Sequence, residues 1–311
     1  MRALVTGAAG FVGSYLVSYL HQKGFEVWAS FHKNSRTFPF PVHWIQSDLT
    51  CTEETLALVR KSRPDYVFHL AAYARPAMSW KGPEETIRTN VSSSVFLLEG
   101  MTRFAPKARG IFVSTGQVYG GAFLNKKQVK ESDTANPVAP YAGSKLLMEM
   151  AALQFIKSCR LKIVIARAFN QIGTGQPSGF VFPDFCRQVA LIEKRKMEPA
   201  IHVGNVDVVR DFIHVEDGVR AYLTLARHAT AGNIYNVGGG RGISLKNILQ
   251  HLKRKAKIPF EIKKVDSLYS KDSIPRAVSD SSKLRKLGWR PERSVWRGLE
   301  EVLEEWRKKV G

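Results

Sequence analysis

The sequence has little cysteine, no long hydrophobic run and too few acidic residues to balance its basic ones. Its 3 cysteines among 311 residues are far apart and form no Cys-x-x-Cys pair, so we expect a reducing, cytoplasmic location without disulfides or structural zinc. No apolar run approaches the roughly 20 residues that cross a bilayer, and glycines interrupt the N-terminus where a signal peptide would be apolar. The 8 histidines form no metal-ligand pair, so we expect no metal site and exclude a metal-dependent enzyme.

The excess of positive charge is the most unusual property of the chain. It has 47 Lys and Arg against 27 Asp and Glu, a formal net charge of +20. Residues 1–60 hold five basic and four acidic residues, whereas residues 251–311 hold seventeen and nine. An RNA-binding protein is one alternative that this charge suggests, but the basic runs at 253–257 and 283–286 lack interleaved aromatic residues. We therefore expect neither a nucleic-acid partner nor a membrane.

The N-terminal segment has the pattern of a nucleotide-binding strand, turn and helix. An apolar run at 2–6 precedes Gly7, Gly10 and Gly13, and apolar residues then recur at helical spacing to about residue 20. The next apolar run, at 25–29, completes a βαβ unit. Glycines in such a turn let a pyrophosphate approach the helix N-terminus, so the pattern predicts a dinucleotide site.

Alternation of strands and helices continues through the first half of the chain. Compact apolar runs at 66–70, 110–114 and 163–166 are separated by helical segments. This pattern predicts an α/β fold with a doubly wound parallel sheet, that is, a Rossmann domain. We expect this NAD(P)-binding domain to span residues 1–170, completed by about 210–238, and a smaller C-terminal α/β substrate-binding domain to span 171–311.

The residues after the second predicted strand bear on the choice of cofactor. An acid at this place binds the ribose 2′-hydroxyl and selects NAD. Here residues 29–36 contain no carboxylate but include His32, Lys33 and Arg36. Basic groups suit a 2′-phosphate, so the sequence favours NADP(H), with NAD(H) as the alternative.

A tyrosine and a lysine have the spacing of a catalytic pair. Tyr141 and Lys145 lie four residues apart at the start of a predicted helix, which places both on one face. An ammonium group beside a phenol lowers the phenol's pKa toward the range useful for proton transfer. The hydroxyls of Ser114 and Thr115 end a predicted strand, where open α/β sheets bind ligands, and either is placed to bond a substrate oxygen.

Several motifs, taken in order, resemble one enzyme family. They lie at 6–13, 48–49, 69–72, 89–91, 113–120, 141–145, 167–170, 210–212 and 235–237. Together they are similar to the extended short-chain dehydrogenase/reductases that modify nucleotide-activated sugars. The stretches at 167–176, 179–181 and 203–205 further resemble the GDP-mannose branch, which holds GDP-mannose 4,6-dehydratases and GDP-4-keto-6-deoxy-mannose reductases.

The resemblance implies a role for each matching residue. Tyr141 would exchange a proton with the sugar C4 oxygen, Lys145 would assist it and hold the nicotinamide ribose, and Thr115 would be the catalytic Ser/Thr. The implied cofactor-binding residues are Gly7, Gly10, Phe11, Val12, Gly13, His32, Lys33, Arg36, Asp48, Leu49, Leu70, Ala71, Ala72, Asn90, Tyr141 and Lys145. The implied substrate-binding residues are Ser79, Thr115, Gln117, Asn170, Arg187, Asn205, Arg210 and Arg276.

Two positions favour a reductase within this family. Dehydratases that resemble this chain carry a Glu, often after an Asp, directly behind the catalytic Thr, but Gly116 and Gln117 stand there. A carboxamide exchanges no proton at ordinary pH, so the acid needed to eliminate water is absent. We therefore expect a GDP-4-keto-6-deoxy-hexose reductase that uses NADPH, with a 4,6-dehydratase or 4-epimerase as the alternative. Reductases of the family often have an acid where Gln117 stands, which is a departure of this chain.

Two further expectations come from the resemblance. Near the C-terminus the family usually has an Arg-Pro pair where this chain has Ser270 and Lys271, so Lys271 or Arg276 would contact the diphosphate of a GDP-sugar. Family members commonly form dimers through two helices of each subunit. The corresponding segments here are 83–102 and 141–158, so a homodimer is expected.

Overall fold

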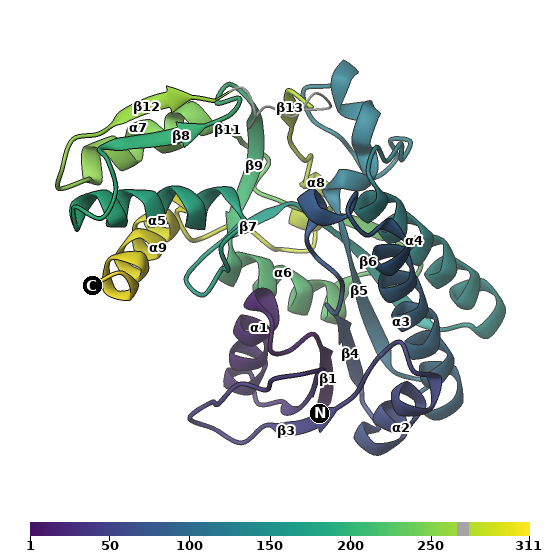
Figure 1. The fold of residues 1–311 in the computed structure, drawn as a ribbon. Helices are drawn as coiled ribbons and strands as arrows, with labels where there is room; N and C mark the ends of the chain where they lie inside the picture. The colour runs from purple at the N-terminus through teal and green to yellow at the C-terminus, as the bar shows by residue number, and fades with distance from the viewer. Residues whose placement is uncertain (266–273) are drawn as a thin grey trace.

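The computed structural model describes residues 1–265 and 274–311, which form two lobes built on sheets of different size (Figure 1). In the larger lobe, each strand of a seven-stranded sheet runs parallel to its neighbours. From edge to edge the strands are β10 (Ile234–Val237), β6 (Lys162–Ala168), β5 (Arg109–Thr115), β4 (Tyr66–His69), β1 (Arg2–Thr6), β2 (Glu26–Phe31) and β3 (His43–Gln46). This order confirms the predicted doubly wound α/β fold.

Helices cover both faces of the large sheet, because its central strands are buried on both sides. The helices of this lobe are α1 (Phe11–Gln22), α2 (Thr52–Ser62), α3 (Pro83–Phe104), α4 (Pro140–Cys159) and α6 (Val215–His228). On one face, Leu16 of α1 and Tyr222 of α6 belong to one buried cluster. On the other, Leu97 of α3 and Met148 of α4 belong to a second cluster, so the sheet lies between two apolar layers.

The smaller lobe contains a mixed sheet, a pair of parallel strands and three longer helices. The helices are α5 (Val181–Glu193), α7 (Leu245–Lys255) and α9 (Val295–Lys309). The strands are β7 (Asn170–Ile172), β9 (Val209–His214), β11 (Gly242–Ser244) and β13 (Arg276–Ala277) in the sheet, and β8 (Ala200–Val203) with β12 (Glu261–Lys264) in the pair. Buried Val189, Leu252 and Leu299 join the three helices in one core. The predicted smaller C-terminal domain is thus present as an α/β lobe.

The chain returns from the smaller lobe to the larger one after β9. α6 packs against α1, and β10 pairs with β6 at the edge of the large sheet. β9 itself pairs with β7, β11 and β13 in the smaller sheet, so the return begins with α6. The return therefore starts at Val215 and not at about residue 210 as expected. We propose on this basis that residues 1–170 and the return up to about 238 act as the cofactor-binding domain, and the rest of 171–311 as the substrate-binding domain.

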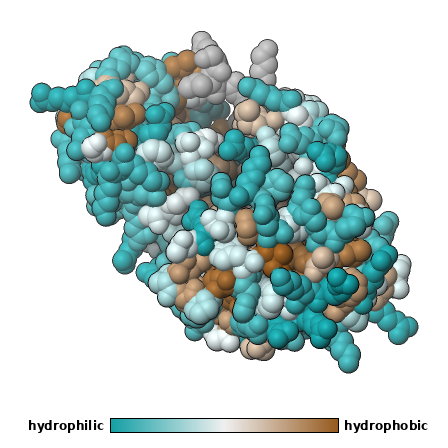
Figure 2. Space-filling view, turned by 60° about the horizontal axis from the view of Figure 1, so that its bottom comes forward, coloured by the Kyte–Doolittle hydropathy of each residue, from teal (hydrophilic) through white to brown (hydrophobic). Residues whose placement is uncertain are grey.

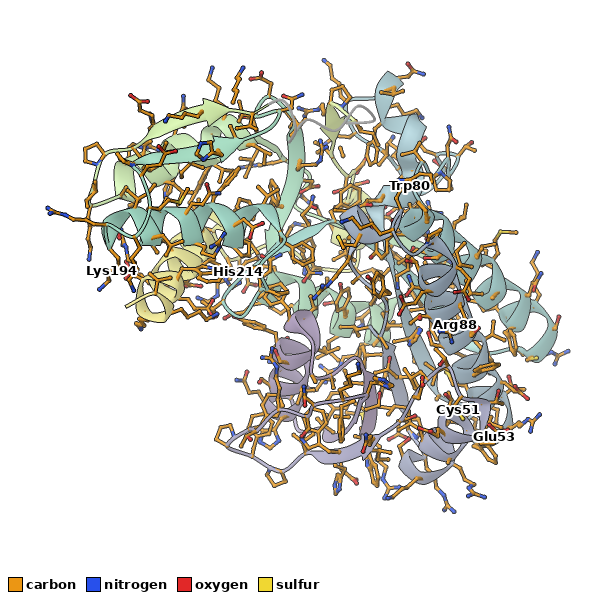
Figure 3. All side chains as sticks on the ribbon, viewed as in Figure 1. Cys51, Glu53, Trp80, Arg88, Lys194 and His214 are labelled. Carbon is orange, nitrogen blue, oxygen red and sulfur yellow. The ribbon has the colours of Figure 1, made fainter. Side chains whose placement is uncertain are left out.

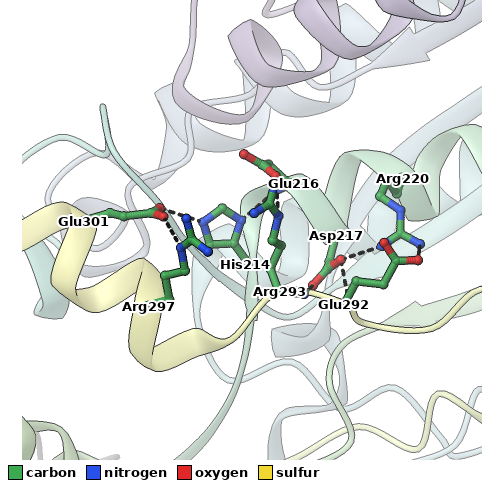
Figure 4. Close-up of polar contacts among 8 residues, drawn as sticks. All are labelled: His214, Glu216, Asp217, Arg220, Glu292, Arg293, Arg297 and Glu301. Atoms are coloured by element: carbon green, nitrogen blue, oxygen red, sulfur yellow. Dashed lines mark hydrogen bonds and ion pairs between the residues drawn. The ribbon is translucent and has the colours of Figure 1, made fainter.

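The two lobes are joined by polar contacts where α6 begins, close to His214 (Figure 3). His214 lies within 3.2 Å of the Glu301 carboxylate of α9 (Figure 4). The buried Asp217 carboxylate accepts hydrogen bonds from the backbone N–H groups of Glu292 at 3.0 Å and Arg293 at 2.9 Å, just before α9. The Arg293 side chain pairs with Glu216 at 2.8 Å. This cluster holds the start of α6 to the segment that leads into the smaller lobe.

The surface is mainly hydrophilic on the face that Figure 2 shows, where hydrophobic residues form small separate patches. Among residues 1–265 and 274–311, Trp80 is the most exposed large hydrophobic side chain, at 66%. Across residues 1–265 and 274–311, no helix combines the length and the apolar character needed to cross a membrane.

Candidate active site

The glycine-rich turn between β1 and α1 has no room for side chains. Gly7 has a φ of +68°, and a Cβ atom on it would lie 2.8 Å from the backbone nitrogen of Ala71. A Cβ on Gly13 would lie 2.1 Å from the carbonyl oxygen of Gly7. Gly10 is the N-cap residue of α1, with Phe11 and Val12 in its first turn. The bare backbone and the helix N-terminus fit the pyrophosphate of a dinucleotide.

Arg36 folds back over this glycine-rich turn. Its Nε donates to the carbonyl oxygen of Ala9 at 2.7 Å, and its Nη1 donates to the Ser14 hydroxyl at 3.2 Å. The structure thus brings a guanidinium group to the first turn of α1. His32 and Lys33 lie on the same exposed segment after β2. These three are the residues expected at the 2′-phosphate.

Asp48 lies after β3 with its carboxylate charged. Its Oδ1 accepts hydrogen bonds from the Thr50 hydroxyl at 2.7 Å and the Thr50 amide at 2.9 Å. These bonds lower the pKa of Asp48 below its ordinary value, and His32 and Arg88 add to that effect. Arg88 projects from α3 (Figure 3), and its effect on the pKa of Asp48 shows that this helix lies near the carboxylate.

Asn90 connects the segment after β4 to the helix of Tyr141. The buried Asn90 accepts from the Tyr73 amide at 2.6 Å, just beyond Leu70, Ala71 and Ala72. Its Nδ2 donates to the Ser144 hydroxyl at 2.9 Å, and Ser144 in turn donates to the carbonyl oxygen of Tyr141 at 2.8 Å. The expected cofactor residues after β4 are therefore tied to the first turn of α4.

Thr115, Tyr141 and Lys145 come together where β5 ends and α4 begins. All three are buried. Burial raises the pKa of Tyr141 to about 12, and a hydrogen bond with Thr115 opposes this rise. Burial lowers the pKa of Lys145 to about 8, and the charge of Glu149 opposes that fall. The phenol is therefore protonated near neutral pH, as a proton donor must be.

One expectation about this pair differs from the structure. We expected the Lys145 ammonium to lower the pKa of Tyr141, but burial dominates and the phenol's pKa is raised. The reason is geometric, because the Lys145 Nζ donates to the carbonyl oxygen of Val113 at 2.8 Å. Lys145 thus contacts the strand that carries Thr115.

Gly116, directly after Thr115, has no room for a side chain. A Cβ on Gly116 would lie 2.7 Å from the Phe169 ring, so a longer side chain requires that ring to move. The Gln117 side chain is exposed, and its backbone N–H donates to the Thr115 hydroxyl at 3.2 Å. The structure therefore gives a steric reason for the glycine that distinguishes this chain from the dehydratases it resembles.

Three expected substrate residues lie on neighbouring strands of the smaller sheet. Asn170, Arg210 and Arg276 belong to β7, β9 and β13, and β9 pairs with both other strands. Asn170 Nδ2 donates to the carbonyl oxygen of Asp211 at 2.9 Å, and Arg210 Nη1 donates to that of Ile274 at 2.8 Å. Arg276 Nε donates to the carbonyl oxygen of Lys127 at 3.0 Å.

The remaining expected substrate residues come from other segments. Arg187 is exposed on α5, and the Asn205 side chain accepts from the Asp207 amide at 2.9 Å. The buried Ser79 hydroxyl donates to the carbonyl oxygen of Pro76 at 2.7 Å. Lys271 lies outside the described residues. Within the described part of the chain, no hydrogen bond or ion pair joins the side chains of Arg187, Asn205 or Ser79 to the smaller sheet.

A cavity of about 850 Å³ lies away from the catalytic trio. Its walls come from α1, Arg36 and α9, and Thr174 and Gly175 also line it. The candidate active site is therefore identified by its catalytic side chains and not by the volume of a cavity. Among residues 1–265 and 274–311, no group of three or more His, Cys, Asp or Glu is placed to hold a metal ion.

Sequence reasoning missed Glu149 and its buried partner Arg167. Glu149 follows Lys145 by four residues, the same spacing that connects Tyr141 with Lys145. That spacing was the available signal. Arg167 was noted as part of a motif, but its partner on α4 becomes visible in the tertiary structure.

Comparisons with known proteins agree with this site. Residues 4–302 match the family described as GDP-mannose 4,6 dehydratase. The chain is 30% identical to the GDP-6-deoxy-D-mannose reductase of Pseudomonas aeruginosa, over 99% of this chain and 98% of that protein.

Solved structures resemble the chain over nearly its whole length. The structure of RMD from Pseudomonas aeruginosa complexed with NADPH matches with a TM-score of 0.85 and 29% identity, covering 99% of this chain and 98% of that one. UDP-glucose 4-epimerase from Thermotoga maritima, with UDP-glucose, matches with a TM-score of 0.88 and 28% identity, covering 100% of both chains. The chain therefore belongs to the GDP-mannose 4,6-dehydratase family of extended short-chain dehydrogenase/reductases, and it is an NAD(P)-dependent nucleotide-sugar oxidoreductase.

Proposed function

We propose that this protein uses NADPH to reduce the C4 ketone of a GDP-4-keto-6-deoxy-hexose. The observation that carries this proposal is an intact Thr115, Tyr141 and Lys145 trio beside Gly116, where the Phe169 ring leaves no space for an acid. Ketone reduction needs a hydride, one proton and an oriented carbonyl, whereas elimination of water needs further acid and base groups. The full-length similarity to a GDP-6-deoxy-D-mannose reductase supports the same choice.

The three catalytic residues have distinct roles in this proposal. The reduced cofactor, when bound, supplies the hydride that adds to C4. Tyr141 gives its phenolic proton to the C4 oxygen, which completes the alcohol, and then regains a proton from water. Its raised pKa keeps that proton available. Thr115 orients the ketone oxygen, and the charged Lys145 side chain, which lies against the strand that carries Thr115, would hold the nicotinamide ribose.

The cofactor preference for NADPH rests on the segment after β2. Arg36 lies on the first turn of α1, and a guanidinium group binds phosphate oxygens through two parallel hydrogen bonds. Lys33 is exposed on the same segment. Substitution of Arg36 by Ala is expected to weaken NADPH binding more than NADH binding, measured by cofactor fluorescence. Equal weakening of both would leave NAD(H) as the cofactor.

The substrate's nucleotide diphosphate is assigned to the smaller lobe. Arg187 and Arg210 suit its phosphate oxygens, and Arg276 takes the place of the family's usual arginine. Asn170 and Asn205 offer amides to the nucleotide-sugar, while Ser79 and Gln117 would meet the sugar.

The three free cysteines support a reducing, cytoplasmic location.

Turnover of freshly generated GDP-4-keto-6-deoxy-mannose with NADPH tests the proposal. Oxidation of NADPH is expected with the native chain and is expected to fall by about 10²–10⁴ in Tyr141→Phe. Unchanged turnover in that variant would contradict the mechanism. Conversion of GDP-mannose itself would identify a dehydratase, and inversion at C4 without net cofactor oxidation would identify an epimerase.

A homodimer through α3 and α4 is part of the proposal. Ile87 of α3 is 40% exposed, and Leu147 and Met150 of α4 are 44% and 53% exposed. Large apolar side chains on the outer sides of two adjacent helices suit burial against a second copy. Light scattering is expected to give twice the chain mass for the native protein and the single mass for Leu147→Glu/Met150→Glu.

A further inference from the structure

A layer of buried polar side chains lies directly beside the catalytic trio. Ser114 on β5, Arg167 on β6 and Asn236 on β10 are register partners across three adjacent strands. They therefore form a row on one face of the sheet. Each is at most 4% exposed, and Thr115 follows Ser114 in the chain. Such a row in the core of a parallel sheet requires a partner for every polar atom.

Glu149 of α4 is the centre of this layer. Its carboxylate accepts from the Ser114 hydroxyl at 2.5 Å and from Arg167 Nε at 3.0 Å and Nη2 at 2.7 Å. Arg167 also lies over the Tyr119 ring, 4.6 Å from its centroid, while Tyr119 donates to Asn236 at 2.7 Å. Both strands β5 and β6 thus hold one carboxylate in a fixed place.

That carboxylate is one helical turn from Lys145. Residues four apart on a helix lie on the same face, so the Glu149 charge acts on the Lys145 ammonium. The burial that lowers the pKa of Lys145 is opposed by Glu149. Among the described residues, His69 is the other titratable side chain whose pKa Lys145 affects, and burial lowers the pKa of His69 to about 3, so it is neutral. Glu149 is therefore the anion that favours a charged Lys145.

A buried ion pair is poorly explained by stability alone. Replacing such a pair with apolar side chains of similar size is often neutral or stabilising, because both charges lose their hydration. Here Arg167 Nη1 also lacks a hydrogen-bond partner within the described residues. The buried Glu149 carboxylate is better explained if its charge acts on Lys145, one helical turn away.

We infer that Glu149 is a positioning residue: its carboxylate, held by Arg167 and Ser114 one helical turn from Lys145, keeps the Lys145 side chain charged for its part in the proposed reduction. The inference rests on the proposed function, since it assigns Glu149 a part in that reaction. Glu149 is buried and its carboxylate is bonded to Ser114 and Arg167, so we assign it an effect that acts through Lys145.

The pH dependence of kcat/KM tests this role. In Glu149→Gln, the loss of activity on the alkaline side is expected to begin about one pH unit lower than in the native chain, because Lys145 loses its proton more easily. Glu149→Asp keeps the charge and is expected to restore the native profile in part. Ser114→Ala is the matched control, because it removes a hydrogen bond to the same carboxylate without changing any charge.

A second variant guards against misfolding. Glu149→Gln leaves Arg167 buried without its partner, so Glu149→Gln/Arg167→Met removes both charges and is expected to show an alkaline shift in the same direction but smaller than that of Glu149→Gln. If both variants lose activity equally at every pH, with the alkaline limb unmoved, the inference is wrong and Glu149 is structural. If the Ser114→Ala limb shifts as far as that of Glu149→Gln, the electrostatic role is also wrong.

A substrate-free measurement separates this inference from the proposed function. NADPH affinity is measured by the fluorescence of the cofactor between pH 6 and 9. It is expected to decrease as pH rises, and this decrease is expected to begin at a lower pH in Glu149→Gln than in the native chain. That result with no turnover of the 4-keto sugar would uphold the role of Glu149 and overturn the proposed substrate. Normal turnover, with the same pH dependence in both chains, would uphold the proposed substrate and overturn the role of Glu149.

Discussion

At the residue scale, this site depends on groups whose surroundings change their ordinary chemistry. Tyr141 and Lys145 are both buried, and burial favours the neutral form of each. It raises the pKa of Tyr141 to about 12 and lowers the pKa of Lys145 to about 8. His69 is buried between the hydroxyls of Thr6 at 2.8 Å and Ser94 at 2.9 Å. Each of these positions tolerates its polar group because a specific partner is supplied.

The glycine-rich turn gives a prediction about cofactor binding. Gly13→Ala is expected to weaken NADPH binding by at least about tenfold, because the new Cβ would lie 2.1 Å from the Gly7 carbonyl oxygen and force the turn apart. Gly143→Ala is the control, since its Cβ would meet nothing within 4 Å. Fluorescence titration measures both affinities. Equal affinities in the two variants would show that the turn does not bind the cofactor.

His69 gives a prediction about stability and pH. Its pKa is about 3 in the folded chain and near the ordinary histidine value of 6.5 in the unfolded chain, so the unfolded state takes up a proton first as pH falls. The free energy of unfolding should therefore decrease by about 1.4 kcal/mol for each pH unit below 6.5. Urea denaturation should show a shallower decrease in His69→Gln. The exposed His228→Gln is the control, and its slope should match the native one.

At the scale of elements, α6 is the connection on which the placement of the two lobes depends. It packs on α1 within the larger lobe, yet its first turn binds the segment before α9. Asp217 makes this connection from a fully buried position, whereas Glu216 makes an ion pair with Arg293 near the surface. Because Asp217 is buried and Glu216 is not, we expect the loss of the Asp217 carboxylate to reduce the free energy of unfolding more than the loss of the Glu216 carboxylate.

Substitutions at these neighbours test that difference. Asp217→Ala leaves the backbone N–H groups of Glu292 and Arg293 without acceptors, and is expected to reduce the free energy of unfolding by about 2–5 kcal/mol. Glu216→Ala is expected to cost less than about 1 kcal/mol, because its ion pair is exposed to solvent. Urea unfolding curves compare the two. Similar losses would mean that the buried contact is not the stronger one.

At the scale of the whole molecule, the net charge of +20 acts on ligands that are polyanions. Both a dinucleotide and a nucleotide-sugar carry phosphates, and a positive protein attracts them over about one Debye length. Many of the basic residues lie at helix ends, as in Lys253, Arg254 and Lys255 of α7. There they also offset the partial negative charge of the helix C-terminus.

Salt is expected to slow cofactor association. The rate constant for NADPH binding, measured by stopped-flow fluorescence, should fall by about tenfold between low and high ionic strength, because mobile ions screen the attraction. NADH has fewer charges and should show a shallower dependence. Identical dependences for the two cofactors would show that the net charge does not steer them.

Patterns of short range in the sequence determined the first strand, turn and helix, and the pairing of Tyr141 with Lys145. Both follow from local geometry, since glycine spacing sets a turn and a spacing of four sets a helix face. The strand β3 escaped prediction because His43–Gln46 is short and partly exposed, and is stabilised by its pairing with β2.

Contacts between distant segments were decided by the tertiary structure alone. The sequence does not show that Arg36 covers the glycine-rich turn or that Glu149 meets Arg167. It also predicted a lowered pKa for Tyr141, which the folded chain raises. Burial and hydrogen-bond partners set these properties, and both arise only when separate segments pack together.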